Sequence, residues 1–306
     1  MTQHTRTVGS RQWPVAAPFL VVAATVTSLA AQPAPDSAAL TASIDALARD
    51  RGVEVAVAAR RLDAAVAFAR RDEVVFHAAS TMKVPVMIEL YRQAVEGRVP
   101  LDMPVPVVNE FRSMVDGSPF ALSAEDDSEP TLYAALGQSR PARELCELMI
   151  TRSSNLATNL LIDRLGVERI QETVERLGGA GMTVRRKLED GKAYEQGLSN
   201  TTTARGLAAL MEAIASGRAV SPAASREMVE ILTRQAFRDG IPAGLPPGTV
   251  VAHKTGEISS VNHDAAIVFG PHPYVLVVLV RGRDAAVREP VIAEVARRVH
   301  AVLARP

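Results

Sequence analysis

Segments with strand patterns lie at opposite ends of this chain, and a long helical stretch separates them. Residues 53–75 contain two alternating apolar runs joined by a short polar break, which predicts two strands and a tight turn. Residues 274–281, YVLVVLVR, are apolar along nearly their whole length, as expected of a strand in the centre of a sheet. One sheet built from both chain ends is the simplest arrangement.

Helical periodicity of apolar residues dominates the rest of the chain. It predicts helices at residues 37–50 and 284–303, and the stretch 80–235 is mainly helical as well. The sequence therefore predicts an α+β fold, in which residues 37–79 and 236–306 form a sheet domain and residues 80–235 form an inserted all-helical domain. Because clefts at such junctions are favoured ligand sites, we expect the functional site there.

Residues 1–31 have the three-part layout of a secretory signal peptide. Two arginines precede an apolar run at 15–29 that holds no acidic residue, and small residues follow it, so we predict cleavage after Ala30 or Ala31. A membrane anchor is the alternative, but the run is short for a span of about 20 residues. We therefore expect a periplasmic or secreted protein with no stable membrane anchor after cleavage.

The charge and composition of the chain limit the classes of partner and cofactor that we expect. Lysine plus arginine and aspartate plus glutamate each number 34, and this zero net charge argues against nucleic acid or an anionic membrane surface as the main partner. The six histidines are scattered without a metal-binding spacing. The single cysteine, Cys146, can form no intrachain disulfide and is expected to be a buried thiol. We expect a monomer that needs neither a metal nor another cofactor.

Ser80 and Lys83 form the first of three short motifs near the predicted junction. Positions three apart share one face of a helix, so the amine of Lys83 can reach the hydroxyl of Ser80. A buried lysine near other cations loses its proton more easily and can then activate a serine as a nucleophile. The alternative is a helix that begins with a capping serine and carries a surface lysine.

The second motif is TRSSNLATNLL, which lies between two helical runs at residues 151–161. Ser153 could relay a proton, and Asn155 could hold a substrate carbonyl or Lys83. The alternative is that these residues only cap the following helix, since serine and asparagine are preferred N-cap residues.

The third motif is AHKTGE at residues 252–257, on a predicted strand. Lys254 beside Thr255 would supply positive charge for a substrate carboxylate, and Gly256 would let a ligand approach the backbone. An edge strand protected by a lysine is the alternative. Each motif alone is weak, but all three together, in this order, are much less expected by chance.

Together the motifs resemble those of class A β-lactamases and related penicillin-recognising serine hydrolases. The resemblance runs from about Leu40 to Leu303, and its strongest pieces are ASTMKVPV, LMITRSSNLATNLLIDRLG, NTTTARGLAAL and HKTG. It implies an antiparallel five-stranded sheet flanked by helices, plus an all-helical domain. It also implies a secreted enzyme whose substrate is a small-molecule β-lactam or a peptidoglycan peptide.

The resemblance assigns roles to individual residues. Ser80 would open the lactam ring and form an acyl-enzyme, with Lys83 as base or proton shuttle and Ser153 passing a proton to the departing nitrogen. Backbone N–H groups of Ser80 and Glu257 would form the oxyanion hole. The implied substrate-binding residues are Asn155, Lys254, Thr255, Gly256, Glu257 and His263.

Hydrolysis of the acyl-enzyme needs a further base, which the family supplies from a glutamate on a surface loop. The stretch TVRRKLED fits that loop when Thr183, Lys187 and Glu189 are matched to it, so Glu189 becomes the candidate base. The alternative is that Glu189 is one acid in a charged loop. Three departures bear on this step. Lys187 and Asn200 replace the loop's usual Arg–Asp ion pair, the loop between Glu189 and Asn200 is shorter than usual, and Ala193 stands near the position of a water-holding asparagine.

Three further departures lie close to the substrate. Ser154 replaces the family's usual aspartate between Ser153 and Asn155. Glu257 would place an acid at the mouth of the site and weaken the binding of anionic β-lactams. His263 stands where many members have a carboxylate-binding arginine, and it could do that work only when protonated. Otherwise it is a neutral hydrogen-bonding residue beside Asp264.

Four functions are compatible with these residues. The first is a secreted serine β-lactamase that acylates and deacylates. The second is a D,D-peptidase or transpeptidase that is inhibited by β-lactams, and the third is a sensor that stays acylated. The fourth, an inactive homologue, is disfavoured because the motif residues are all intact, namely Ser80, Lys83, Ser153, Lys254 and Thr255. A Glu189 placed beside a water favours the first function, and a displaced Glu189 favours the second or third.

Overall fold

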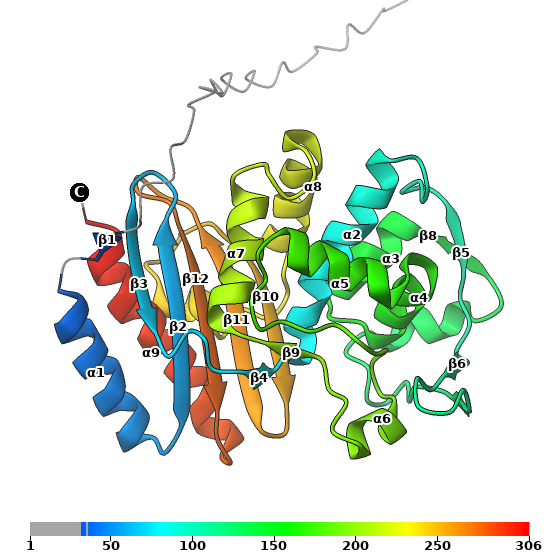
Figure 1. Cartoon of the computed structure of the whole chain (residues 1–306), viewed down its shortest axis with the longest axis horizontal. Helices are drawn as coiled ribbons and strands as arrows, with labels where there is room; N and C mark the ends of the chain where they lie inside the picture. The colour runs from blue at the N-terminus through cyan, green and yellow to red at the C-terminus, as the bar shows by residue number, and fades with distance from the viewer. Residues whose placement is uncertain (1–31, 35, 306) are drawn as a thin grey trace, which may run out of the picture. The chain divides into compact units, whose positions relative to one another are not determined.

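The computed structural model describes residues 32–34 and 36–305. The predicted signal peptide at 1–31 lies outside these described residues. Within them, no helix combines the length and apolar character needed to cross a membrane. The elements follow the predicted order, with the main strands near both ends and helices between them (Figure 1).

One sheet contains strands from both ends of the chain, in the order β1-β3-β2-β12-β11-β10. Five of its strands pair with one another in antiparallel fashion, as the family resemblance implied: β2 (Glu54–Arg61), β3 (Val66–Arg70), β10 (Val251–Ile258), β11 (Val261–Val268) and β12 (Tyr274–Arg281). The sixth, β1 (Gln32–Pro33), pairs in parallel with β3 and is too short to give a sequence pattern. β12 pairs with β2 along its whole length, so the two chain ends meet inside the sheet.

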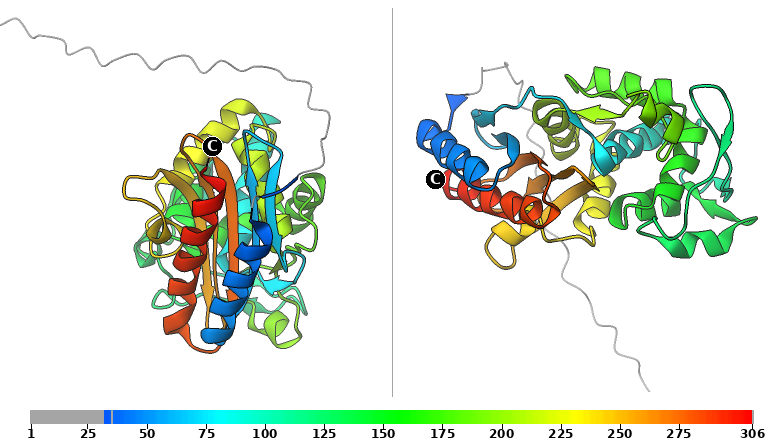
Figure 2. Two further views of the ribbon diagram at one scale, coloured as in Figure 1. Left: turned by 90° about the vertical axis from the view of Figure 1, so that its left-hand side faces the viewer. Right: turned by 90° about the horizontal axis from the view of Figure 1, so that it is seen from below.

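Alternating side chains of β12 contribute to two hydrophobic layers, one on each face of the sheet. Val277 and its neighbours at odd positions pack toward one face, and Leu276 and Val278 pack toward the other. The helices that cover the two faces are α7 (Ala204–Ala215) on one, and α1 (Ser37–Asp50) with α9 (Ala285–Leu303) on the other. Figure 2 shows α1 and α9 side by side along their face.

The position of α7 corrects the predicted domain boundary. Its residues fall inside the range 80–235, which was expected to form the inserted helical domain, yet α7 packs on β12, β2 and β11. The buried Leu207 and Leu210 belong to the same core cluster as Val277 of β12. An amphipathic helix covers whichever apolar surface faces it, and its sequence pattern does not say which surface that is.

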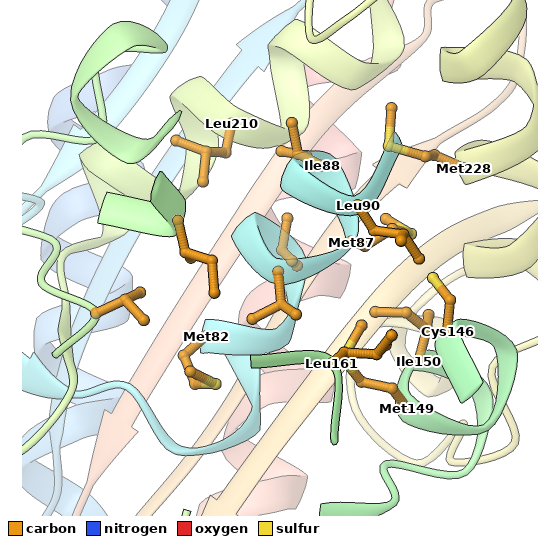
Figure 3. Close-up of a cluster of buried hydrophobic side chains, with 14 of the residues drawn as sticks. Met82, Met87, Ile88, Leu90, Cys146, Met149, Ile150, Leu161, Leu210 and Met228 are labelled. Atoms are coloured by element: carbon orange, nitrogen blue, oxygen red, sulfur yellow. The ribbon is translucent and has the colours of Figure 1, made fainter. Parts of the chain in front are cut away.

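The helix α2 (Lys83–Val95) runs through the centre of the helical part of the chain, and most of its residues are buried. Figure 3 shows the core around it, formed by Met82, Met87, Ile88, Leu90, Cys146, Met149, Ile150, Leu161, Leu210 and Met228. Cys146 is buried as predicted, and burial raises the pKa of its thiol to about 12. The 3₁₀ turn η1 (Ala79–Met82) leads directly into α2, so Ser80 and Lys83 lie on one continuous helical path.

Shorter elements complete the chain between η1 and β10. The helices are α3 (Ala142–Thr151), α4 (Asn155–Leu165), α5 (Val167–Arg176), α6 (Gly191–Glu195) and α8 (Pro222–Thr233). The short strand pairs are β4 (Phe76–His77) with β9 (Thr201–Thr202), β5 (Pro104–Pro106) with β8 (Ser139–Pro141), and β6 (Phe111–Arg112) with β7 (Pro119–Phe120). The remaining 3₁₀ turns are η2 (Pro130–Ala135) and η3 (Ile241–Gly244). Residues 152–154 join α3 to α4, so the second motif begins at a break between two helices.

Candidate active site

Lys83 is the centre of a buried polar cluster that joins the first two motifs. Its Nζ lies 3.0 Å from Ser80 Oγ, as the predicted spacing requires. The same amine donates to Asn155 Oδ1 at 2.8 Å and to the carbonyl oxygen of Ser153 at 2.6 Å. Because the Lys83 side chain is fully buried, the alternative of a surface lysine is excluded.

The surroundings of Lys83 favour its neutral form. Burial lowers the pKa of its amine well below the usual range, and the positive charge of Lys254 lowers it further. The carboxylates of Asp127 and Glu189 oppose this shift and have the smaller effect. A neutral amine 3.0 Å from Ser80 Oγ presents a lone pair, so Lys83 can accept the hydroxyl proton.

Ser153 links the two lysines. Its Oγ lies 3.2 Å from Lys83 Nζ and 3.1 Å from Lys254 Nζ. Burial lowers the pKa of Lys254 to about 7, and Asp264 opposes that shift. Although β10 is an edge strand, Lys254 is fully buried and so does not protect that edge. A hydroxyl between two amines with lowered pKa values is suited to the relay role predicted for Ser153.

Left-handed backbone conformations gather at this site. Five non-glycine residues in the described part of the chain have a positive φ, and three of them are Ala79 at 45°, Ser153 at 61° and Glu189 at 61°. Such conformations cost of order 1–3 kcal/mol each and persist where the surrounding structure holds them. They occur next to the nucleophile Ser80, at the relay residue Ser153 and at the candidate base Glu189. The positions of these three site residues therefore depend on backbone conformations that lower the stability of the fold.

Gly256 lets β10 contact the turn that carries the nucleophile. A Cβ atom at this position would lie 2.9 Å from the backbone nitrogens of both Ser80 and Thr81. Gly256 was predicted to let a ligand approach the backbone, but in the structure it first allows the backbone of Ser80 and Thr81 to approach β10. This contact holds the Ser80 turn against β10, from which the N–H of Glu257 would complete the predicted oxyanion hole.

Glu189 is directed toward the same site. Asn155 Nδ2 donates to Glu189 Oε1 at 2.8 Å while Asn155 Oδ1 accepts from Lys83, so one amide joins the two candidate bases. Glu189 and Ser80 line a common cavity of about 330 Å³. Burial raises the pKa of the Glu189 carboxyl, and the hydrogen bond from Asn155 opposes that rise. This placement favours the role of base over that of a charged-loop residue.

The loop before Glu189 is held without the ion pair that the sequence resemblance leads one to expect. Asn200 Oδ1 accepts from the backbone N–H groups of Arg185 at 2.9 Å and Arg186 at 3.1 Å, and its Nδ2 donates to the Arg186 carbonyl at 3.0 Å. Lys187 instead pairs with Asp163 on α4 at 2.6 Å. As expected, no ion pair joins Lys187 to Asn200, and amide hydrogen bonds together with a different ion pair hold the loop.

Two residues that support the site were not singled out by the sequence analysis. Asn159 exchanges two hydrogen bonds with the backbone of Leu188, at 2.8 and 3.0 Å, and so fixes the residue before Glu189. It stands four residues after Asn155 on α4, and that spacing was the available signal. Asp127 lies in AEDDSEP, the acidic stretch at residues 124–130, yet its carboxylate is buried against the start of α4. No spacing rule points to Asp127.

His263 is the neutral hydrogen-bonding residue that the sequence analysis allowed, and not a carboxylate-binding cation. Its ring is buried, with Nε2 2.9 Å from the carbonyl oxygen of His77 and Nδ1 2.7 Å from that of Asn262. Burial lowers the pKa of His263 to about 4. A histidine that is neutral at ordinary pH cannot replace a cationic arginine in holding a carboxylate.

A second cavity, of about 270 Å³, adjoins the nucleophile on the side of Thr255 and is acidic. Its lining includes three acidic residues, Asp239, Glu257 and Glu289, and three hydroxyl residues, Ser80, Ser153 and Thr255. The Glu257 side chain is 65% exposed, which agrees with the predicted acid at the mouth of the site. Burial, then Asp239 and Glu257, raise the pKa of Glu289. In the part of the chain that the structure describes, no three His, Cys, Asp or Glu side chains are arranged to hold a metal ion.

Comparison with known proteins identifies the family. The model of the β-lactamase enzyme family matches residues 39–303. Similar curated proteins include β-lactamase 1 of Bacillus cereus (28% identical over 46% of this chain and 47% of that protein) and a β-lactamase of Streptomyces albus G (31%, over 50% and 52%). The matched region therefore spans about half the length of these two relatives.

Solved structures extend the match to nearly the whole fold. The structure of PBP-A matches with a TM-score of 0.74 at 30% identity, covering 88% of this chain and 96% of that one. A variant of PBP-A in an acyl-enzyme complex with penicillin G matches with the same TM-score at 29% identity, covering 89% and 97%. With the family model matching most of its length, this chain belongs to the β-lactamase enzyme family.

Proposed function

We propose that this protein is an exported class A-like serine β-lactamase that hydrolyses the β-lactam amide bond through an acyl-enzyme on Ser80. The observation that carries the proposal is the convergence of Ser80, Ser153 and Asn155 on the fully buried amine of Lys83. A lysine buried in this way is suited to act as a base and poorly suited to a structural role, because a charge there would be costly.

Acylation would use the groups around Lys83. The neutral amine takes the proton of Ser80 as Oγ attacks the lactam carbonyl carbon. The N–H groups of Ser80 and Glu257 stabilise the oxyanion, an interaction worth roughly 2.7–4 kcal/mol per donor in other hydrolases. Ser153, which lies within 3.2 Å of both lysine amines, donates its proton to the departing nitrogen and is reprotonated from them.

Deacylation would use Glu189. A carboxylate whose pKa is raised from its usual range is a stronger base and can activate a water in the cavity that it shares with Ser80. Asn155 holds Glu189 through Nδ2 at 2.8 Å, and Asn159 fixes the preceding residue. Water attack on the acyl carbon then releases the product and regenerates Ser80.

A second function, a β-lactam-sensitive D,D-peptidase or an acylated sensor, is favoured by the acidic cavity. Asp239, Glu257 and Glu289 lie on the Thr255 side of the nucleophile, and a neutral His263 stands where the resemblance places a cationic arginine in many members. Both features weaken the attraction of an anionic β-lactam. The likeness to PBP-A, which is described in an acyl-enzyme complex with penicillin G, is compatible with this alternative as well.

Intact mass spectrometry over time separates these functions. The purified protein, starting after Ala31, is mixed with a penicillin, and both protein mass and free penicillin are followed. Turnover without a lasting adduct supports the β-lactamase, a lasting adduct supports the peptidase or sensor, and no reaction supports an inactive homologue. Ser80→Ala should abolish every adduct, and labelling at the wild-type rate in that variant would refute the assignment of the nucleophile.

Export rests on the sequence of residues 1–31 alone. We propose that the chain is cleaved after Ala30 or Ala31 and released into the periplasm or the medium. N-terminal sequencing of the protein recovered from an expressing cell tests this, since uncleaved protein inside the cell would contradict it.

A further inference from the structure

We propose that Asp127 is a positioning residue for catalysis, because it holds the start of α4 so that Asn155 can contact Lys83 and Glu189 together. This inference rests on the proposed function above, and it adds a residue that none of the motifs contains. The carboxylate comes from the stretch 124–130, which is far from α4 in sequence, and its side chain is buried.

The carboxylate of Asp127 is surrounded by donors from the first residues of α4. Its Oδ2 accepts from the backbone N–H of Asn155 at 3.0 Å and from that of Leu156 at 2.8 Å. The hydroxyls of Tyr133 at 3.2 Å and Ser154 at 3.4 Å complete the environment of this oxygen. The first N–H groups of a helix have no partner within the helix, so a carboxylate here accepts their hydrogen bonds. Its negative charge also interacts favourably with the positive end of the helix dipole.

Ser154 alone cannot satisfy these groups. It is the N-cap of α4, and its Oγ accepts only from the N–H of Ala157, at 3.1 Å. The N–H groups of Asn155 and Leu156 would be left without a partner if Asp127 were removed. A buried donor that loses its acceptor costs about 1–3 kcal/mol, so the first turn would shift to find another.

Asp127 is itself fixed in place. Its Oδ1 accepts from the N–H of Glu129 at 3.0 Å, and Tyr133 on η2 donates to its Oδ2. The carboxylate is therefore a clamp between the 124–130 loop and α4 and not a mobile surface acid. Any displacement of this clamp is transmitted to the backbone of Asn155, the residue whose amide lies between the two candidate bases.

The charge of Asp127 also acts on the lysine that activates the nucleophile. It opposes the lowering of the Lys83 pKa, together with Glu189 and against Lys254. Removing this charge lowers the pKa of Lys83 further, so the neutral amine persists to lower pH. The low-pH limb of the acylation rate should therefore move to lower pH in Asp127→Asn, a change that a purely structural role would not produce.

The test compares four proteins with wild type. Asp127→Ala removes the clamp, and Asp127→Asn removes the charge while keeping the size. The double variant Asp127→Ala/Ser154→Asp offers a replacement carboxylate from position 154, whose present hydroxyl is 3.4 Å from Asp127 Oδ2. Glu125→Gln is the matched control, because it removes a charge from an exposed position of the same loop. Circular dichroism on heating establishes that each variant is folded.

Two measurements are made on each folded protein. The first is the acylation rate with a chromogenic β-lactam as a function of pH, and the second is hydrogen exchange of the peptide that spans residues 153–158. We expect Asp127→Ala to lower the acylation rate by roughly 10²-fold, as a misplacement of about 1 Å does in other enzymes, and to speed exchange at Asn155 and Leu156. The double variant should recover at least tenfold of that rate, and Glu125→Gln should match wild type.

Several results would overturn the inference. Acylation of Asp127→Ala within threefold of wild type would do so, as would a rescue that restores slow exchange without restoring the rate. If wild type is not acylated at all, the proposed function fails, and the exchange measurement still decides whether Asp127 holds α4. Unchanged exchange in both a folded Asp127→Ala and a folded Asp127→Asn would show that it does not.

Discussion

Replacing Gly256 with alanine tests how closely the sheet must approach the nucleophile. The new Cβ would lie 2.9 Å from the backbone nitrogens of Ser80 and Thr81 and 3.1 Å from Thr81 Cγ2. Ordinary contacts begin near 3.4 Å, so β10 and the Ser80 turn would have to separate by about 0.5 Å. Both nitrogens belong to backbone, which cannot rotate away as a flexible side chain can.

The consequences of this separation differ for stability and for catalysis. Overpacking of this kind costs typically about 1–3 kcal/mol of folding free energy. The Ser80 N–H and the Glu257 N–H lie on the two surfaces that move apart, so the oxyanion hole would widen. Since one well-placed donor is worth roughly 2.7–4 kcal/mol, a partial loss predicts acylation slower by about 10²-fold.

Stopped-flow acylation with a chromogenic β-lactam measures the catalytic effect, and thermal unfolding measures the stability effect. Gly270→Ala is the control, because a Cβ at Gly270 would meet nothing within 4 Å and the residue does not need a left-handed backbone. Gly256→Ala that acylates as fast as Gly270→Ala would refute the view that close contact between β10 and the Ser80 turn shapes the oxyanion hole.

Three further predictions concern the titrating groups of the site. Glu189→Gln should let the acyl-enzyme accumulate in intact-mass spectra, because the amide cannot take a proton from water, and unchanged turnover would exclude Glu189 as the deacylating base. Lys83→Ala should slow acylation by about 10³-fold or more in stopped flow, and a normal rate would remove Lys83 from that role. The pKa of Lys254 is lowered to about 7, so its amine is cationic below that pH and neutral above it. The KM for an anionic penicillin should therefore rise as pH increases through about 7, and in Lys254→Arg, which stays charged, this rise should disappear.

The elements and the three motifs could be predicted because each depends on local patterns. Alternating and continuous apolar runs indicated strands near both chain ends, and the three-residue spacing of Ser80 and Lys83 placed both on one helical path. That five strands form an antiparallel sheet came from the family resemblance. Lys254 is brought to Ser153 by its place on β10, a tertiary contact that no local pattern predicts. Only the joint presence of the three motifs indicated that these two residues would meet.

The errors arose where tertiary contacts decide the outcome. Asp127 stands in a stretch of acids with no periodicity, so nothing local shows that it is buried against the N–H groups of α4. His263 was given its role by alignment position, but its ring is buried, and burial keeps it neutral although the backbone carbonyls of His77 and Asn262 favour the charged form. The helix α7 carries an apolar stripe that would fit either layer, and only the assembled sheet selects one.

The pairing of β2 with β12 has a consequence for how the protein is made. The register joins Arg61 to Tyr274 and Glu54 to Arg281, so almost the entire chain must be synthesised before the sheet can close. Contacts between residues so far apart in sequence fold slowly, because a long loop must be closed before they form. The nucleophile and its lysine are synthesised early, but Lys254 arrives with β10 near the end. A chain that is truncated before β10 carries Ser80 and Lys83 yet has neither the second amine nor a strand to hold their turn in place.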